Sequence, residues 1–213
     1  MKAMLDLDAL IGNFGPRAVS LLCAEAAINN KAMEAIHRQD FDNRVQSVRS
    51  WLDLYKVLQG IDGFRRDALA RAVLDWADHR SGDSRLATLD AIVHAHADLM
   101  AACSGADGRG RDFTSLASKV LWLRYPEEVP LYDRFAQEAL WMLSKLEPGL
   151  PPVPKSALKY DAFVLIWKTL YDRYALSLGA IDNKGYPYRV RIFDRILWLI
   201  GEPVYGHFKL PRS

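Results

Sequence analysis

Long apolar runs and an excess of charge of one sign are missing from this chain of 213 residues. No apolar run approaches the roughly 18 residues of a membrane-spanning helix, so we expect no membrane segment. The N-terminal stretch MKAMLDLDAL contains acidic residues within its apolar part, which argues against a signal peptide. The formal net charge is only +2, which excludes a polybasic nucleic-acid binder but permits a basic face on part of the surface.

Cysteine and clustered metal ligands are also scarce. The two cysteines, Cys23 and Cys103, stand among apolar or small residues, which predicts buried free thiols in a reducing cytoplasm. His94 and His96 lie two residues apart in a helical pattern, so their rings point about 200° apart and cannot share one metal ion. No cysteine or acidic cluster accompanies them. We therefore expect neither a metal site nor a cofactor.

Strand-like alternation is rare, whereas the helical periodicity of apolar residues runs through nearly the whole chain. The residues are 50% hydrophobic and 25% charged, as in an ordinary globular protein that buries a sizeable core. These patterns predict an all-α fold, a compact multi-helix domain. Helices are expected over residues 16–29, 40–59, 64–79, 83–102, 116–124, 133–145, 156–178 and 188–200.

Prolines interrupt the helical pattern near residue 150. They form a stiff connector that contains Pro148, Pro151, Pro152 and Pro154. At this length the connector leaves two organisations open. The chain is either a single all-α domain of residues 1–213, or two lobes, residues 1–147 and 155–213, which the connector joins.

The stretch TSLASKVLWLRYPEEVPLYD, residues 114–133, is the part of the sequence that most suggests chemistry. Placed on a helix at 100° per residue, Leu116, Val120 and Leu123 form an apolar stripe, and Lys119 lies at its edge. A partly dry setting there favours the neutral amine, which is the nucleophilic form of lysine. The structural interpretation also stays open, because a lysine at the edge of a stripe often extends its head group to solvent.

Asp133 precedes the helical sequence RFAQEALW and is therefore a good helix N-cap. Capping is compatible with catalysis, because a carboxylate that accepts backbone N–H groups stays ionised. An ionised carboxylate beside a departing base stabilises a cationic sugar transition state, or it orients a nucleophile. A lysine and an aspartate on adjacent helix ends are thus the minimum equipment for attacking a sugar carbon and releasing a base.

The sequences SKVL, residues 118–121, and PEEVPLYDR, residues 126–134, resemble a pattern in bacterial proteins with the 8-oxoguanine DNA glycosylase (OGG) fold. That pattern is a Thr/Ser-Lys pair, an apolar helix, a proline-containing loop and an apolar-apolar-Asp that opens the next helix. The closing sequence RIFDRILWLIG, residues 191–201, is similar to the C-terminal helix of the same group. The resemblance implies a distant relative of the helix-hairpin-helix DNA glycosylases, with a fold like their core.

In that superfamily the lysine attacks the deoxyribose C1′ of an extruded base, and the aspartate assists. The resemblance therefore implies that Lys119 is the nucleophile and Asp133 its partner. It implies a DNA glycosylase or lyase that acts on a modified or damaged base, in DNA repair or bacterial defence, with DNA as the partner.

The superfamily's hairpin run, of the Leu-Pro-Gly-Val-Gly type, is absent before Lys119, where this chain has RDFTSLAS. That hairpin binds DNA phosphates through backbone N–H groups. Its absence keeps a second interpretation open, in which the chain is a non-catalytic nucleic-acid- or protein-binding module of the same fold.

Four residues are candidates for contacting nucleic acid: Arg109, Arg111, Ser118 and Arg134. The first two belong to the glycine-rich segment 104–111, SGADGRGR, which is flexible by composition and lies just ahead of the lysine helix. This segment lacks the Gly-Lys-Ser/Thr ending of a phosphate loop, and a disordered surface loop is the alternative interpretation. Ser118 and Arg134 adjoin the candidate lysine and aspartate in the motif.

Overall fold

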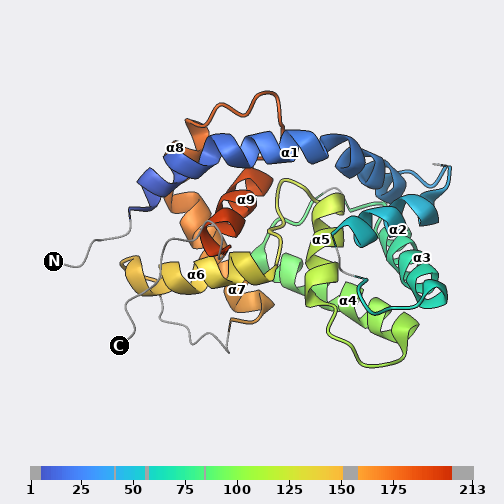
Figure 1. Cartoon of the computed structure of the whole chain (residues 1–213). Coiled ribbons are helices and arrows are strands. Elements are labelled where there is room, and N and C mark those ends of the chain that lie inside the picture. The colour runs from blue at the N-terminus through green and yellow to red at the C-terminus, as the bar shows by residue number, and fades with distance from the viewer. Residues whose placement is uncertain (1–5, 41, 56–57, 84, 151–157, 203–213) are drawn as a thin grey trace. The chain divides into compact units, whose positions relative to one another are not determined.

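The computed structural model of the chain describes residues 6–40, 42–55, 58–83, 85–150 and 158–202. Within these ranges it contains nine α-helices and no strand, which confirms the predicted all-α fold class (Figure 1). None of these helices is both long enough and apolar enough to pass through a membrane. In chain order the helices are α1 (Leu7–His37), α2 (Arg44–Leu54), α3 (Gly63–His79), α4 (Leu89–Asp107), α5 (Thr114–Arg124), α6 (Arg134–Leu146), α7 (Tyr160–Arg173), α8 (Ala175–Gly179) and α9 (Arg189–Gly201).

Side-chain caps set the starts of three helices. Asp62 accepts the backbone N–H of Arg65 at the start of α3, and Asp133 caps α6. The predicted starts of these two helices are correct to within one residue. The start of α4 comes later than predicted, because Thr88 supplies its cap by accepting the backbone N–H of Ala91.

Helix α1 is much longer than predicted and has Pro16 in its interior. A proline disfavours helical backbone at the preceding residue, partly through a clash with the Cβ of that residue. Here the preceding residue is Gly15, which has no Cβ. Leu7 and Ile11 lie upstream on one helical face, and each is only 1% exposed. Their burial stabilises the additional turns, so the prediction that this helix begins at residue 16 is wrong.

Contacts along the chain divide it into two compact units. Unit 1 comprises Met1–Ala24 and Pro130–Ser213, and unit 2 comprises Glu25–Val129. Helix α1 contributes its first part to unit 1 and its last part to unit 2. The predicted lobe boundary at the proline connector stays a prediction, because residues 151–157 lie outside the described residues.

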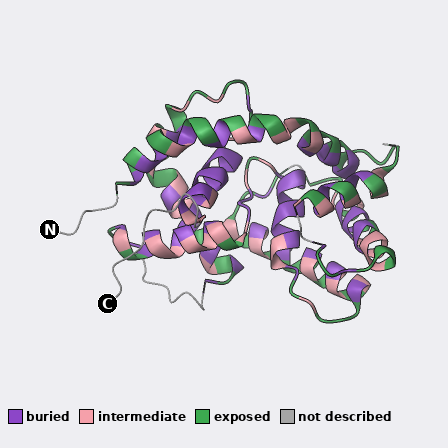
Figure 2. Cartoon of the chain, in the orientation of Figure 1, coloured by how far each residue is buried: buried purple, intermediate pink, exposed green. Residues whose placement is uncertain are grey.

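The packing of α6 against α9 is the most extensive helix contact in unit 1, and α7 also packs on α6 (Figure 1). Helix α9 is buried along most of its length (Figure 2). Aromatic rings join α7 to α9, since the ring centroids of Trp167 and Phe193 lie 5.4 Å apart. The helix predicted over residues 156–178 is divided near Tyr174 into α7 and α8.

Helix α9 ends against the first turn of α6. A Cβ added to Gly201 would lie 2.7 Å from the carbonyl carbon of Phe135 and closer still to its oxygen. At the same contact the rings of Phe135 and Trp198 stand edge to face, with centroids 5.4 Å apart. Gly201 therefore permits a backbone approach that a larger residue would prevent, and this approach supports the start of α6.

Replacement of Gly201 by alanine should lower the unfolding free energy by about 1–3 kcal/mol, because the overlap is with backbone atoms that cannot rotate away. Urea denaturation measures this change. Gly179→Ala is the matched control, since Gly179 also ends a helix and an added Cβ there meets nothing within 4 Å. Equal effects of the two substitutions would show that the α6–α9 approach is not tight.

In unit 2, α3 packs on both α2 and α4, and α4 packs on α5. Arg44 of α2 and Asp78 of α3 form an ion pair of 2.6 Å that reinforces the first of these contacts. Every residue of α5 from Leu116 to Arg124 is buried, as the colouring of this helix in Figure 2 shows. A helix that is buried on all sides is a core element.

The two cysteines are both free, but only one of them is buried. Cys103 of α4 has a fully buried thiol, and burial raises its pKa to about 12. The prediction that Cys23 is buried is wrong, because this residue is exposed on α1 while its neighbour Leu22 faces the core.

Candidate functional site

Lys119 lies in the second turn of a helix that is buried from Leu116 to its end, rather than at the edge of an amphipathic helix. Its residue is only 5% exposed, and its Nζ donates a hydrogen bond of 2.6 Å to the Oγ of Ser115, one turn earlier. An amphipathic helix would expose one face of α5 to solvent. Neighbouring elements cover that face as well, so the head group of Lys119 is held inside the protein.

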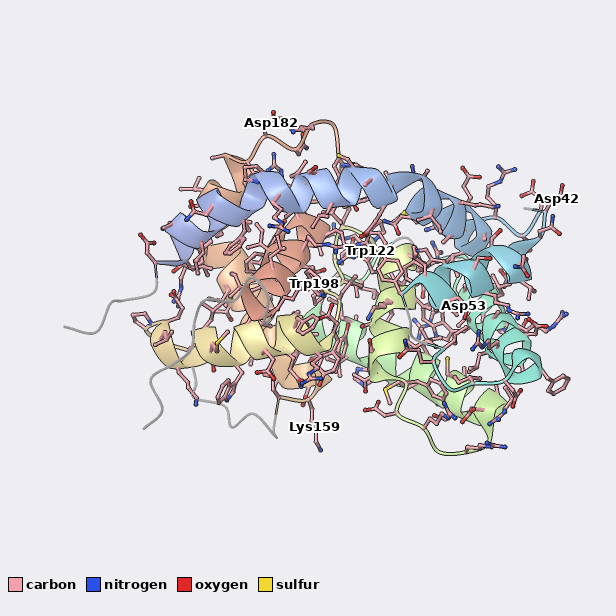
Figure 3. The ribbon with its side chains drawn as sticks, viewed as in Figure 1. Asp42, Asp53, Trp122, Lys159, Asp182 and Trp198 are labelled. Atoms are coloured by element: carbon pink, nitrogen blue, oxygen red, sulfur yellow. The ribbon has the colours of Figure 1, made fainter. Side chains whose placement is uncertain are left out.

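Lys119 differs in this respect from the other lysines that the structure describes. It is the one lysine in the described part of the chain that is buried. Lys159, for example, is exposed, and its side chain extends away from the ribbon in Figure 3. The amine of Lys119 is instead shielded from bulk water, which distinguishes Lys119 from a surface lysine.

The first turn of α5 is held from two directions. Asp112 accepts hydrogen bonds from the backbone N–H of Thr114 at 2.8 Å and from its hydroxyl at 2.6 Å. The carbonyl of Thr114 accepts a bond of 3.0 Å from Nε2 of His96, a buried residue of α4. Burial lowers the pKa of His96, so the ring is neutral at physiological pH and Nε2 carries its hydrogen.

The last turn of α5 is held just as firmly. Arg124 donates to the carbonyls of Arg80 at 2.9 Å and Asp83 at 3.0 Å, and also to Nδ1 of His37 at 2.8 Å. Because Nδ1 accepts, Nε2 of His37 carries the hydrogen and donates it to the carbonyl of Leu123 at 3.1 Å. Burial, and then the nearby charge of Arg124, lower the pKa of His37. Both ends of the helix that carries Lys119 are therefore fixed within unit 2.

Asp133 is the N-cap of α6, as predicted. Its Oδ1 accepts the backbone N–H groups of Phe135 and Ala136, each at 2.9 Å. Its backbone is extended, with φ −139° and ψ 168°, as an N-cap requires. The side chain is half-buried, so the carboxylate is both fixed and partly accessible.

The loop before Asp133 is anchored by Asp194, a residue that the sequence analysis did not single out. Asp194 is only 2% exposed, and its two carboxyl oxygens accept the backbone N–H of Leu131 at 3.0 Å and the indole N–H of Trp167 at 2.8 Å. Burial raises the pKa of Asp194 to about 8, although the neighbouring Arg191 acts in the opposite direction. An aspartate inside the apolar sequence RIFDRILWLIG was the available signal, since a carboxyl in a buried helix needs partners.

The predicted nucleic-acid contacts fall into two groups. Arg109 and Arg134 are exposed. Arg111 instead donates to the carbonyl of Gly60 at 2.8 Å, and its Nε lies 3.9 Å from the buried carboxylate of Asp107. Ser118 is fully buried, and its Oγ donates to the carbonyl of Ser115 at 3.0 Å.

The glycine-rich segment is more ordered than its composition suggests. Helix α4 continues through Asp107 and ends at Gly108, which adopts a left-handed conformation with φ 66°. Asp107 also lies 3.6 Å from Arg65 of α3. The segment is therefore tied to the start of α3 by its charged side chains.

The histidines behave as the helical spacing predicts. His94 is exposed and bonds the carbonyl of Asp90 through Nδ1, whereas His96 is buried against Thr114. No group of three or more metal-binding side chains occurs among the residues that the structure describes.

Lys119 belongs to unit 2 and Asp133 to unit 1, so their pairing stays a prediction. Each unit contains one functional group in a fixed position. In unit 2 it is the buried amine of Lys119, on a helix that is hydrogen-bonded at both ends. In unit 1 it is the carboxylate of Asp133, which caps a helix after a loop held by Asp194. No family model, curated protein or solved structure matches this chain.

Proposed function

We propose that this chain is a DNA glycosylase or lyase that acts on an extruded modified or damaged base, with Lys119 as nucleophile and Asp133 as its partner. The observation that carries the proposal is the burial of the Lys119 amine on a helix held at both ends. A dry, fixed amine is suited to nucleophilic attack, whereas a structural lysine normally keeps its head group in water.

The proposed reaction uses the amine in its neutral form. The Nζ lone pair attacks the deoxyribose C1′, and the bond from C1′ to the base breaks as the new C–N bond forms. The departing base takes up a proton. The sugar ring then opens, because the nitrogen loses its protons to solvent while the C1′–O4′ bond breaks and O4′ takes up a proton. This leaves an imine between Lys119 and C1′, which water hydrolyses or which undergoes elimination of the 3′ phosphate.

The carboxylate of Asp133 has a supporting role in this scheme. Positive charge develops on the sugar as the base departs, and a nearby fixed carboxylate stabilises it. Two backbone N–H groups already hold one oxygen of Asp133, so little reorganisation is needed. The exposed side chains of Arg109 and Arg134 are the candidates for contacting DNA phosphates, while Arg111 and Ser118 serve internal contacts.

A second candidate function, that of a non-catalytic nucleic-acid- or protein-binding module in a bacterial defence system, is favoured by a specific observation. Lys119 and Asp133 each have a sufficient structural role, the first as a donor to Ser115 and the second as a helix cap. The two functions are distinguished by reduction with borohydride in the presence of DNA that carries modified bases. Only the enzyme forms an imine for the reagent to fix.

Asp133→Asn should separate capping from catalysis. Asparagine caps a helix about as well as aspartate, so we expect nearly unchanged thermal unfolding but a rate of adduct formation reduced by at least about tenfold. Asp133→Ala should lose about 1 kcal/mol of stability in addition. Thermal melts and single-turnover trapping measure the two effects. Full activity of the Asn variant would mean that Asp133 is only a cap.

A further inference from the structure

The nitrogen of Lys119 has to lose protons in the proposed reaction although it is buried. An ammonium loses one proton to become the attacking amine. The secondary ammonium that forms on attack loses a second before the imine can form. Proton transfer needs a group within hydrogen-bonding distance, so a buried nitrogen requires a neighbour that can pass protons toward solvent.

Ser115 has the position that this transfer requires. Its Oγ lies 2.6 Å from the Nζ of Lys119, and its residue is partly exposed whereas Lys119 is 5% exposed. A hydroxyl both accepts and donates, so it can bond the ammonium as an acceptor and the neutral amine as a donor. Ser115 therefore connects the buried nitrogen to the less buried start of α5.

The turn that carries Ser115 is also built to stay in place. Thr114, immediately before it, is held by Asp112 and by His96, and the carbonyl of Ser115 itself accepts the hydroxyl of Ser118 at 3.0 Å. Contacts on both sides of the residue fix the backbone from which its hydroxyl projects. This bracing keeps Oγ and Nζ one helical turn apart and within bonding distance.

We propose that Ser115 is a positioning residue that relays protons between the Lys119 amine and solvent, an inference that rests on the proposed function. In each transfer the Ser115 hydroxyl gives its proton to water or a buffer base and takes one from Nζ. The serine is unchanged at the end, and one proton has moved from the nitrogen to solvent. No bond to carbon is made or broken on Ser115.

A test without DNA uses formaldehyde and cyanoborohydride on the whole chain. Formaldehyde condenses with an amine and releases water, and the hydride reduces the resulting iminium to a methylamine, so the nitrogen undergoes the same proton losses. Ser115→Ala should lower the methylation rate of Lys119, measured by peptide mass spectrometry, by at least about tenfold. Imidazole buffer should restore the rate in this variant and leave the wild type unaffected. Exposed Lys159 is the internal standard.

Two further comparisons separate the relay from a general effect on folding. Ser115→Thr and Ser115→Val have the same shape, and only the threonine retains a hydroxyl, so threonine should preserve the rate and valine should not. Ser144→Ala is the matched control, because Ser144 is a buried helical serine whose Oγ bonds the carbonyl of Trp141 at 2.8 Å. Its methylation rate at Lys119 should equal that of the wild type.

The outcomes distinguish this proposal from the proposed function. Equal methylation rates for Ser115→Thr and Ser115→Val, or no response to imidazole, overturn the relay even if the wild type traps DNA. A wild type that traps no DNA, combined with a rate that falls in Ser115→Ala and recovers in imidazole, refutes the glycosylase and retains the relay. If the wild type does trap DNA, Ser115→Val should slow trapping at saturating DNA without weakening DNA binding.

Discussion

The unfolding free energy of the wild type, relative to that of Asp194→Asn, should fall by on the order of 5 kcal/mol between pH 4 and pH 8. Burial raises the pKa of Asp194 from its ordinary value of 3.8 to about 8, and each pKa unit corresponds to about 1.4 kcal/mol. Total stabilities of domains are about 5–15 kcal/mol, so the effect is large.

The sign of this dependence follows from which state holds the proton. Below pH 3.8 the carboxyl of Asp194 is protonated in both states, and its contribution to stability is fully present. Between pH 3.8 and about 8 the folded state holds a proton that the unfolded state has released, so each rise in pH favours unfolding. Above that range both states have released the proton, and the contribution of this carboxyl to stability is fully lost.

The Asp194→Asn substitution also lowers the unfolding free energy by an amount that does not change with pH. Its amide group places an NH₂ where one of the two N–H donors, from Leu131 or Trp167, now meets an oxygen. We expect a loss of about 1–3 kcal/mol at low pH, so the variant is less stable than the wild type there and more stable at pH 9. Urea denaturation across this pH range measures the unfolding free energies of the wild type and of the variant.

Asp172→Asn is the control, an exposed change in the same unit, and its unfolding free energy should stay within about 0.5 kcal/mol of the wild-type value at every pH. A pH-independent difference for Asp194→Asn would contradict the burial of its carboxyl.

Lys119→Ala and Lys119→Gln should lower the rate of covalent adduct formation with DNA by at least about 10³-fold, because no other group replaces the attacking nitrogen. Lys119→Arg should be equally inactive, since a guanidinium stays protonated and is not a nucleophile. Lys119→Met keeps the apolar stem, so it should remain folded while losing the adduct. Gel quantification after borohydride reduction, beside a thermal melt of each variant, measures these effects.

The exposed Lys159 supplies the control for these variants. Lys159→Met removes a lysine of ordinary exposure and should leave the adduct unchanged. A Lys119 variant that retains the wild-type rate would refute the assignment of the nucleophile and leave the binding module as the better interpretation.

Local sequence was sufficient for those features that depend on neighbours in the chain. The all-α class follows from periodicity, and the cap at Asp133 follows from a carboxylate directly before a helical sequence. The opposite orientations of His94 and His96 follow from two steps along a helix. Each of these depends on geometry within a few residues.

Features that depend on distant partners were not predictable in the same way. The stripe on α5 indicated one covered face, but Lys119 is buried because other elements cover the remaining faces. Asp194 acts on Leu131, which is 63 residues earlier in the chain, and no periodicity relates the two. Pro16 was interpreted as a helix start, yet a glycine before it and an apolar face upstream allow the helix to continue. In each case tertiary burial outweighs the local signal.

The most direct test of the proposed glycosylase function is borohydride trapping of the wild type. The substrates are a panel of single- and double-stranded oligonucleotides that carry different modified and damaged bases. Mass spectrometry of the digested product then identifies the attached residue. The glycosylase proposal predicts a borohydride-dependent adduct with at least one member of the panel, attached at Lys119. A folded protein that forms no adduct with any member, or one whose adduct maps to another lysine, would contradict it.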